Sequence, residues 1–260
     1  IAESSRVDNY PGIPGIDGYS LGEKFREHAE SLGVEFTEAQ VLSLGQKDGI
    51  WIIGCDEDIT LESKAVIYAT GCKNRPLGVP GEEKYYGRGL SFCAVCDGAF
   101  YKGKRVAVIG GGDTALDDAM YLSDICEKVY LVHRREFFRG SASTLEKLKQ
   151  KENVEIIVNV RVEEITGDKK IDGIILDNKT KLNISGLFAA VGMIPQTELL
   201  KEFGVLDESN YVKASEDTKT TVNGLFAAGD VRTKQLRQVV TAAADGANAI
   251  YSVMEYLRNI

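Results

Sequence analysis

"KRVAVIGGGDTALDDAMYLSDI", residues 104–125, decides the fold class of this chain. An apolar run too short for a helix leads directly into a glycine turn, and apolar residues at helical spacing follow. The stretch predicts a buried strand, a turn and a helix, and "KVYLVHRR" at residues 128–135 predicts the next strand. This order begins a right-handed crossover unit, so we expect an α/β fold with a parallel sheet.

The glycine turn has the spacing of a dinucleotide-binding loop. In Gly110-x-Gly112-x-x-Ala115, Gly110 would make the tight turn, Gly112 would admit a pyrophosphate, and Ala115 would let the helix pack closely on the strand. The first turn of the helix would offer unpaired N–H groups to phosphate. A glycine turn without a ligand is the alternative, but a turn that joins a strand to a helix favours the nucleotide.

Basic residues at the end of the next strand indicate which dinucleotide binds. A cofactor with a free ribose 2′-hydroxyl requires Asp or Glu there. This chain instead has His133, Arg134, Arg135 and Arg139. Guanidinium groups pair bidentately with phosphate oxygens, so the pattern favours NADPH over NADH. The alternative is that these basic residues are merely solvated at the end of the strand. Four basic groups gathered at one point in a chain of net charge −8 argue against that alternative.

A pair of cysteines stands in "SFCAVCDGAF", residues 91–100, with Asp97 directly after Cys96. A structural zinc site needs a full set of Cys or His ligands, and the chain has 2 histidines and no second close cysteine pair, so we expect no metal. A static disulfide is unusual in a reducing compartment. We therefore interpret Cys93 and Cys96 as a redox dithiol, for which Asp97 could shuttle protons. Because a flavin usually relays electrons from a hydride donor to a disulfide, the pair also points to a flavin.

The rest of the chain predicts a second, similar half. Its expected elements are a helix ending at Gly33, hairpin strands at 51–55 and 58–63, a buried strand at 64–71, and a C-terminal helix at 237–257 with closely packed Ala and Gly residues. The short strands expected at 154–185 instead form an antiparallel meander that caps the parallel sheet of the first half. "GLFAAVG" at 186–192 recurs as "GLFAAGD" at 224–230, which we interpret as one strand used in two related nucleotide-binding halves. The alternative is that two buried strands share apolar residues by chance. "NRPLGVPG", residues 74–81, is a candidate domain boundary.

The composition is that of an ordinary globular protein, with 43% hydrophobic and 27% charged residues among 260. The net charge of −8 argues against nucleic acid and anionic membranes as partners. The sequence has neither an apolar run long enough for a membrane helix nor a leader like a signal peptide, so we expect a cytoplasmic protein. An odd number of cysteines, 5, indicates mostly reduced thiols.

Five motifs of this chain, taken in order, resemble those of the bacterial low-molecular-weight thioredoxin reductases. They are "CAVCDG", "GGGDTA", "HRRxxFR", "AAVGMIPQT" and "GLFAAGDVRTKQLRQVVTAAADG". The resemblance runs from Ile1 to the C-terminus. It implies two Rossmann-like domains of the FAD/NAD(P)-binding type, each in three layers, and a homodimer. Residues 1–79 with 208–260 would form a discontinuous FAD domain, and residues 80–207 the NADPH domain with the cysteine pair.

The resemblance also implies roles for individual residues. Cys96 would be the thiol nearer the flavin, Cys93 the thiol that attacks the partner disulfide, and Asp97 the acid–base residue. The NADPH contacts would be Gly112, Asp113, Thr114, Arg134, Arg135 and Arg139. The flavin contacts would be Asn9, Thr70, Gly71, Gly229, Asp230, Val231, Arg237, Gln238 and Val239, with Asp230 on the ribityl chain.

The implied cycle passes electrons from NADPH through FAD to the cysteine pair and, after a domain rotation about hinges in "RPLGVPG" and "DESN", on to thioredoxin. Other hypotheses are a reductase of another disulfide protein, a dithiol oxidase that uses oxygen, and, outside the enzymes, an NADPH-binding redox module without flavin. Members of the family begin with a strand and a glycine loop for the ADP half of FAD, and no such segment precedes Ile1 here. We therefore expect the chain as given to lack the loop that binds the FAD pyrophosphate.

Overall fold

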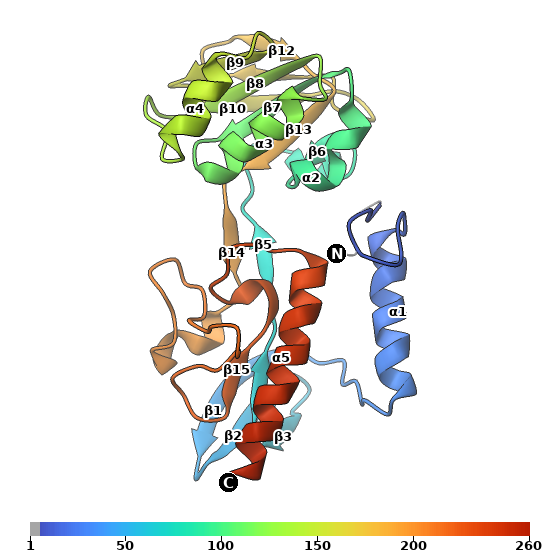
Figure 1. Ribbon diagram of the computed structural model, residues 1–260, viewed down its shortest axis with the longest axis vertical. Coiled ribbons are helices and arrows are strands. Elements are labelled where there is room, and N and C mark those ends of the chain that lie inside the picture. The colour runs from blue at the N-terminus through green and yellow to red at the C-terminus, as the bar shows by residue number, and fades with distance from the viewer. Residues whose placement is uncertain (1–5) are drawn as a thin grey trace. The chain divides into compact units, whose positions relative to one another are not determined.

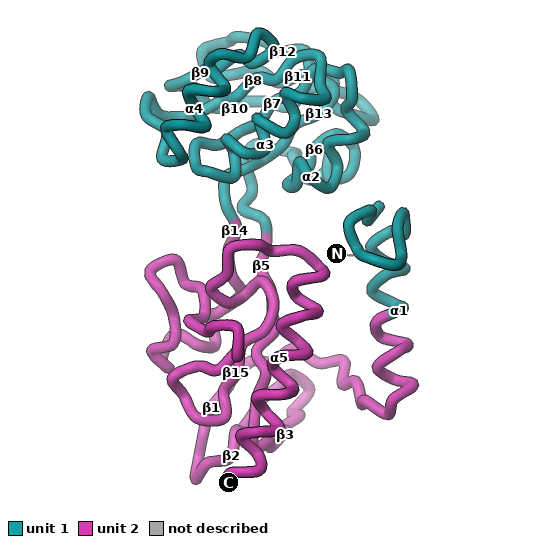
Figure 2. The backbone as a smooth tube through the Cα atoms, in the orientation of Figure 1, with its two compact units in different colours: residues 1–24, 74–192 teal, residues 25–73, 193–260 magenta. Residues whose placement is uncertain are grey.

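The computed structural model describes residues 6–260, and these form two compact units, coloured separately in Figure 2. Unit 1 takes the described residues up to Lys24 and Asn74–Gly192, and unit 2 takes Phe25–Lys73 and Met193–Ile260. The boundaries between the two units reflect only how compactly the residues pack, and they do not identify the cofactor of either unit. The predicted assignment of residues 80–207 to NADPH and of the flanking residues to FAD stays a prediction.

Unit 1 is built on a 5-stranded parallel sheet in the order β6-β13-β7-β8-β9 (Figure 1). Its strands are β6 (Leu90–Ser91), β7 (Arg105–Gly110), β8 (Lys128–His133), β9 (Val154–Val158) and β13 (Gly186–Ala190). β7 and β8 are almost continuously apolar because both faces of the sheet are covered. The predicted α/β fold with a parallel sheet is confirmed.

Helices cover one face of this sheet and a small antiparallel sheet covers the other. The covering elements are α3 (Asp113–Ser123) and α4 (Ala142–Lys149) on the first face, and β10 (Val162–Thr166), β11 (Gly173–Leu176) and β12 (Lys181–Asn183) on the second. Val106 of β7 packs in one apolar cluster with Leu116 of α3, whereas its neighbour Ala107 packs in another with Ile174 of β11. Successive side chains of β7 thus serve opposite faces, which produces three layers.

The segment 154–158 differs from its prediction. It was expected to begin the antiparallel meander, but β9 pairs in parallel with β8, with Val154 opposite Val129 and Val158 opposite His133. The crossover through α4 returns the chain in the direction of β8, which makes β9 the edge strand of the main sheet. The meander itself is confirmed for β10, β11 and β12.

Short helical turns and one longer helix complete unit 1. The short turns are η1 (Glu82–Tyr85), α2 (Ala94–Asp97) and η2 (Gly98–Tyr101). Glu82 is only 1% exposed, and its carboxylate accepts the backbone N–H groups of Gly78 and Val79 at 2.9 and 3.0 Å. It thereby anchors the Pro- and Gly-rich segment predicted as a boundary. α1 (Gly18–Ser31) confirms the predicted N-terminal helix and extends past residue 24 into unit 2.

Unit 2 contains several small sheets around its own core. Its elements are β1 (Val41–Lys47), β2 (Ile50–Cys55) and β3 (Thr60–Ser63) in an antiparallel sheet, β4 (Val66–Tyr68) parallel to β15 (Leu225–Ala227), β5 (Cys72–Asn74) paired with β14 (Met193–Pro195), and the helices η3 (Glu198–Phe203), η4 (Gly229–Val231) and α5 (Val239–Arg258). The core contains Trp51, Leu200, Val212 and Leu225. The predicted hairpin of β2 and β3 is confirmed.

The recurring "GLFAA" segments form similar structures in both units. β13 pairs in parallel with β7, and β15 pairs in parallel with β4. Both strands are almost wholly buried, which explains their shared apolar letters.

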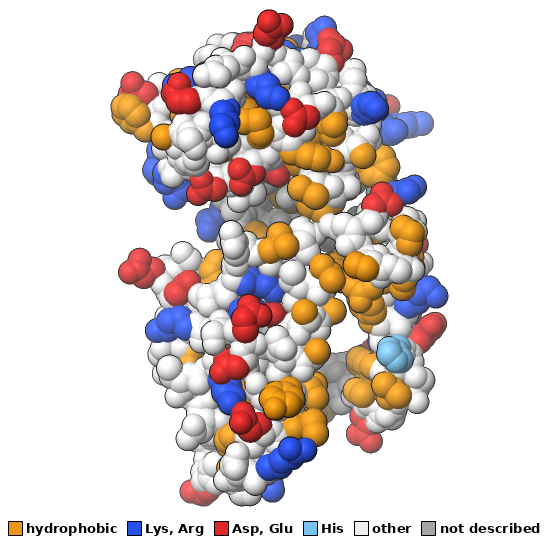
Figure 3. All heavy atoms as spheres, viewed as in Figure 1, with side chains coloured by type: hydrophobic (Ala, Val, Ile, Leu, Met, Phe, Trp, Pro, Cys, Tyr) orange, Lys and Arg blue, Asp and Glu red, His pale blue; other side chains and the backbone are white. Residues whose placement is uncertain are grey.

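α5 confirms the predicted C-terminal helix but buries a different face. Its buried residues are Asp245, Ala249 and Ser252, and among residues 6–260 no neighbouring atom lies within 4 Å of a Cβ built on Gly246. The buried face thus contains Ala249, as expected of an Ala residue, together with the polar Asp245 and Ser252, whereas the expected close packing is absent at Gly246. Tyr251 on α5 is 75% exposed, and Figure 3 shows hydrophobic side chains along the face of unit 2 where α5 runs.

Across residues 6–260, the structure contains no helix with the length and apolar character needed to cross a membrane.

Candidate functional site

The glycine loop joins β7 to α3 in unit 1. A Cβ on Gly110 would meet the carbonyl oxygen of Ala190 and the methyl group of Ala115, so strand and helix lie too close for a side chain. Gly112 precedes α3, and among the described residues no heavy atom outside the loop lies within 4 Å of where its Cβ would be. The space beside Gly112, at the start of α3, is therefore open to an approaching group. This geometry fits the pyrophosphate of a dinucleotide.

Backbone bonds tie the basic loop to the glycine loop. The N–H of Arg139 donates to the carbonyl oxygen of Gly111 at 2.7 Å, and the N–H of Ser141 donates to Oδ1 of Asp113 at 2.7 Å. The predicted arginines Arg134, Arg135 and Arg139 are exposed. The structure thus places these arginines near the glycine loop, after the carboxyl ends of the neighbouring strands β7 and β8.

His133 is placed differently from the arginines that follow it. Its ring is 7% exposed, lies within 3.2 Å of the Phe137 carbonyl oxygen and packs on the ring of Phe138. A Cβ on Gly111 would collide with this ring, so His133 supports the glycine loop from within unit 1. Burial lowers the pKa of His133, which favours the neutral imidazole. Its predicted contact with the nucleotide stays a prediction.

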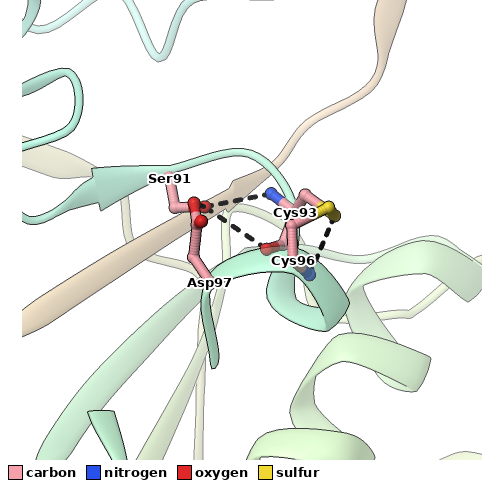
Figure 4. The surroundings of a disulfide bond; sticks show 4 residues. All are labelled: Ser91, Cys93, Cys96 and Asp97. Carbon is pink, nitrogen blue, oxygen red and sulfur yellow. Dashed lines mark hydrogen bonds between the residues drawn. A yellow bond between two sulfur atoms is a disulfide. The ribbon is translucent and has the colours of Figure 1, made fainter. Parts of the chain in front are cut away.

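Cys93 and Cys96 form a disulfide at the start of α2 (Figure 4). Cys93 is the N-cap residue, and the N–H of Cys96 donates to its sulfur at 3.2 Å. An N–H group directed at sulfur stabilises a thiolate there once the disulfide is reduced. Both cysteines are partly exposed.

Asp97 and Ser91 stand beside the disulfide, as Figure 4 shows. The Ser91 hydroxyl donates to Oδ2 of Asp97 at 2.6 Å and accepts the N–H of Cys93 at 3.1 Å. The N–H of Asp97 donates to the Cys93 carbonyl oxygen at 3.1 Å. The predicted acid–base residue is therefore held next to the cysteine pair through a serine that the sequence analysis did not single out.

A second carboxyl group lies under α2. Asp118 on α3 is 9% exposed and shares its helix face with Ala115 and Leu122, which pack in one cluster with Ala94 of α2. Burial, assisted by the neighbouring Asp117, raises the pKa of Asp118 to about 7, although the N–H of Ala94 partly opposes the shift. This carboxyl group therefore titrates in the neutral range directly beside the residue that follows Cys93.

Asp118→Asn is expected to make unit 1 more stable at neutral and alkaline pH. Because the folded pKa is raised from 3.8 to about 7, the folded state keeps a proton that the unfolded state loses, and stability falls as pH rises through this window. Asn cannot ionise, so the variant should gain about 2–4 kcal/mol at a pH of about 8 and almost nothing at a pH of about 4. Hydrogen-exchange protection of α3 at the two pH values measures the difference. Glu152→Gln, at an exposed acidic residue of the same unit, is the control. A gain of equal size at both pH values would contradict the raised pKa.

In unit 2, the turn Gly229–Val231 brings several predicted residues together. The backbone carbonyl oxygen of Asp230 accepts Nε of Arg237 at 3.2 Å and the thiol of Cys72 at 2.9 Å. The guanidinium of Arg237 lies 4.1 Å from the ring centroid of Tyr211. The structure thus joins segments from residues 72, 211, 230 and 237 around one turn.

Buried charges fix this turn to α5. Oδ2 of Asp245 accepts the N–H of Gly229, Nε of Arg232 and Nζ of Lys234, each at 2.8 Å. Oδ1 of Asp245 accepts a second Arg232 nitrogen at 2.6 Å. The side chains of Arg232, Lys234 and Asp245 are 3%, 6% and 3% exposed. Removal of the Asp245 charge would leave two buried cations without the carboxylate that they share.

The side chain of Asp230 provides a test of whether a flavin fits here. Its Oδ1 is buried and has no hydrogen-bond partner among the described residues. Burial raises the pKa of Asp230, against the effect of Lys234 and Arg237. A buried carboxyl oxygen without a partner is costly unless a bound group donates to it. A ribityl hydroxyl group is such a donor, so the residues present fit the predicted cofactor.

The remaining predicted flavin residues have local contacts of their own. Thr70 Oγ1 donates to the Gln196 carbonyl oxygen at 2.6 Å, and the Gly71 carbonyl oxygen accepts the Gln196 N–H at 3.0 Å. Gln238 is the N-cap residue of α5, which begins at Val239. Asn9 belongs to unit 1, and its predicted flavin contact stays a prediction.

Sequence reasoning missed Ser91, Cys72, Tyr211, Asp118 and the buried set of Arg232, Lys234 and Asp245. One signal was available for the buried set, because two basic residues, Arg232 and Lys234, stand two positions apart directly after the "GDV" of the turn. Ser91 and Asp118 have no comparable signal, since Ser and Asp are ordinary residues at a strand end and on a helix.

Comparison with known proteins gives a consistent picture. Residues 5–246 match the family described as pyridine nucleotide-disulphide oxidoreductase. The chain is 39% identical to a thioredoxin reductase of Helicobacter pylori, with 100% of the chain and 87% of that protein covered. It is 35% identical to a thioredoxin reductase of Bacillus subtilis, with coverage of 100% and 84%.

A solved structure is similar as well. The crystal structure of a thioredoxin reductase from Streptococcus pyogenes superposes with a TM-score of 0.91 at 37% identity, and covers 100% of this chain and 86% of its own.

Proposed function

This chain belongs to the pyridine nucleotide-disulphide oxidoreductase family and, within it, to the thioredoxin reductases, and from that premise we propose that it transfers electrons from NADPH to the disulfide of thioredoxin. NADPH-dependent disulfide reduction is the activity of this group. The observation that carries the proposal is the Cys93–Cys96 disulfide, held by Ser91 and Asp97 in the same unit as the glycine loop and the exposed arginines.

The cofactors of this family are FAD and NADPH. In unit 1, the N–H groups after Gly112 would hold the NADPH pyrophosphate, and Arg134, Arg135 and Arg139 its 2′-phosphate. In unit 2, Asp230 would accept a hydrogen bond from the ribityl chain of FAD, with Arg237 beside it. When bound, the flavin accepts two electrons as hydride and passes them on to a disulfide.

The chemistry of the chain's own residues is thiol–disulfide exchange. We assign Cys93 as the thiolate that attacks the partner disulfide, because the Cys96 N–H is directed at its sulfur. Cys96 then attacks the Cys93 sulfur of the mixed disulfide, which restores the Cys93–Cys96 bond and releases the partner as a dithiol. Asp97 accepts the Cys96 proton and returns it to the departing thiolate.

The nucleotide preference gives a direct expectation. Arg134→Ala with Arg135→Ala should raise KM for NADPH about tenfold to a hundredfold, because hydrogen bonds to a charged phosphate are worth about 1.5–3 kcal/mol. KM for NADH, which lacks the 2′-phosphate, should change little. Steady-state kinetics with both nucleotides measure the effect, and Arg161→Ala, an exposed arginine of the same unit, is the control. Equal losses with both nucleotides would argue against a 2′-phosphate site.

Partner, assembly and location follow from the same family. We propose thioredoxin as the protein substrate, a homodimer as the assembly and the cytoplasm as the compartment. A net charge of −8 supports the expectation that neither nucleic acid nor anionic membrane is a partner.

The function is tested with the purified chain, FAD, NADPH and thioredoxin. We expect a flavin absorption band that bleaches when NADPH is added without air, and NADPH oxidation that depends on thioredoxin. A bleached band with no activity on thioredoxin, but activity on another disulfide protein, would change the partner. NADPH binding without any flavin band would favour a nucleotide-binding redox module instead.

A further inference from the structure

Ser91 has an unusual position for a small polar residue. It ends β6, and the parallel pairing of Ser91 with Phe188 of β13 fixes its backbone in the main sheet. Its relative exposure is only 6%, so its hydroxyl group must find partners inside the protein. Those partners are Asp97 and Cys93, which no periodicity in the sequence connects with it.

The hydroxyl group has one proton, and the distances indicate where it lies. Oγ is 2.6 Å from Oδ2 of Asp97 and 3.4 Å from the Cys93 carbonyl oxygen. The short contact with a carboxylate is the stronger, charge-assisted bond, so the proton is shared with Asp97. A lone pair of the same oxygen accepts the Cys93 N–H at 3.1 Å. Ser91 therefore links the acid–base candidate to the backbone of the attacking cysteine.

These bonds hold Asp97 at both ends. Its backbone N–H is bound to the Cys93 carbonyl oxygen at 3.1 Å, and its Oδ2 is bound to Ser91. Rotation of the carboxylate about its side chain would break the bond to Ser91. Asp97 is thus restrained relative to the disulfide by a residue that belongs to the rigid sheet rather than to the short helix α2.

We propose that Ser91 is a positioning residue of the dithiol, which acts through Asp97 and sets the geometry of proton transfer during thiol–disulfide exchange. This inference rests on the proposed function of Asp97. Cys93 thiolate attacks one sulfur of the partner disulfide, and the other partner sulfur leaves as a thiolate that takes up a proton. Cys96 gives its proton to Asp97 and attacks the Cys93 sulfur. The second partner sulfur then leaves and receives that proton. The partner thus gains two electrons from the dithiol, one proton from Cys96 through Asp97, and one proton from solvent, which the first leaving thiolate takes up.

The nature of the leaving thiol separates a proton-transfer role from a structural one. An alkyl thiolate is a poor leaving group and gains from protonation, whereas an aromatic thiolate of low pKa leaves without it. Loss of correct proton transfer should slow reduction of an alkyl disulfide far more than that of an aromatic one. A general distortion of the site should slow both.

The experiment uses the full chain, reduced with dithiothreitol and freed of it, without NADPH. Hydroxyethyl disulfide or dithionitrobenzoate is added, and re-formation of the Cys93–Cys96 bond is followed by rapid alkylation and mass spectrometry. Because no electrons enter from NADPH, the assay gives a result even if the proposed NADPH-dependent function fails.

In this assay Ser91→Ala should slow the reaction with hydroxyethyl disulfide about tenfold and that with dithionitrobenzoate less than about threefold. Ser91→Thr keeps the hydroxyl group and should restore the rate to within about twofold of the parent. In an Asp97→Asn background, Ser91→Ala should have no further effect, because residues that act as one unit are not additive. Ser123→Ala is the matched control, since Ser123 is also 6% exposed in unit 1 but donates only to a backbone carbonyl oxygen.

Two results would overturn the inference. One is a Ser91→Ala variant that affects both disulfides alike, either by reacting with both at the parent rate or by slowing both to the same extent. The other is an effect of Ser91→Ala that persists undiminished in the Asp97→Asn background, which would show that Ser91 acts independently of Asp97. If Ser91→Thr does not fold, the comparison of the two backgrounds still decides the question.

Discussion

Replacement of Cys93 by Ser is expected to abolish NADPH-dependent reduction of thioredoxin, with a loss of at least about a thousandfold in kcat/KM. Serine cannot form the disulfide with Cys96 or a mixed disulfide with the partner, so no electrons can leave the chain by this route. Reduction of bound flavin by NADPH should persist, because that step does not involve the cysteine pair. Stopped-flow absorbance of the flavin and steady-state NADPH oxidation measure the two steps separately.

Cys55→Ser is the matched control for this variant. Cys55 lies on β2 of unit 2 and is a free cysteine. Its replacement should leave turnover unchanged. If Cys93→Ser retained substantial thioredoxin reduction while Cys55→Ser did not, the electrons would have to pass through a different thiol, and the assignment of the site would be wrong.

Asp245→Asn is expected to destabilise unit 2 by about 3–5 kcal/mol, since it leaves the buried Lys234 without its ion-pair partner and the buried Arg232 with only the exposed Glu216, at 3.3 Å. The amide also cannot accept all the donors that now converge on the carboxylate from Gly229, Arg232 and Lys234. Trp51, the only tryptophan of the chain, is fully buried in the core of unit 2. Its fluorescence during urea unfolding therefore reports on this unit specifically.

The control for Asp245→Asn lies on the same helix. Glu255 forms an ion pair with Lys219 in which both side chains are about half exposed, so Glu255→Gln should cost less than about 1 kcal/mol. Similar costs for the two variants would mean that burial of the Asp245 network contributes little.

The pKa of Asp245 gives this contribution a pH dependence. Burial of the carboxyl group raises the pKa, but hydrogen bonds from Arg232 and Lys234 outweigh burial and hold the pKa of Asp245 below its usual value. The contribution of Asp245 should consequently be present at neutral pH and be lost in acid, as pH falls through that lowered pKa.

Asp245→Asn should also affect the flavin site. The carboxylate holds the N–H of Gly229, one residue before the Asp230 side chain that would meet the ribityl group. A weaker hold on the turn should appear as weaker flavin binding even under conditions where unit 2 stays folded.

Much of unit 1 could be predicted because its signals are local. The apolar runs of β7 and β8, the glycines between β7 and α3, and the helical spacing of α3 each lie within a few residues of one another. Local propensity and the geometry of a crossover connection then determine their order in space. The CxxC pair was readable for the same reason, since a spacing of 3 residues brings both sulfurs within bonding reach.

Other features depend on residues that only the folded chain brings together. The sequence of residues 154–158 predicts a strand but not its partner, and the direction of the α4 crossover placed it beside β8. Ser91 reaches Asp97 because the sheet and α2 hold them at one point, and Asp245 meets Arg232 and Lys234 because α5 folds back on the turn. A strand, a turn or a helix is selected by its own residues. The partner of a buried polar group is selected by whichever donors and acceptors the tertiary structure places within hydrogen-bonding distance, because a buried polar group without a partner is costly.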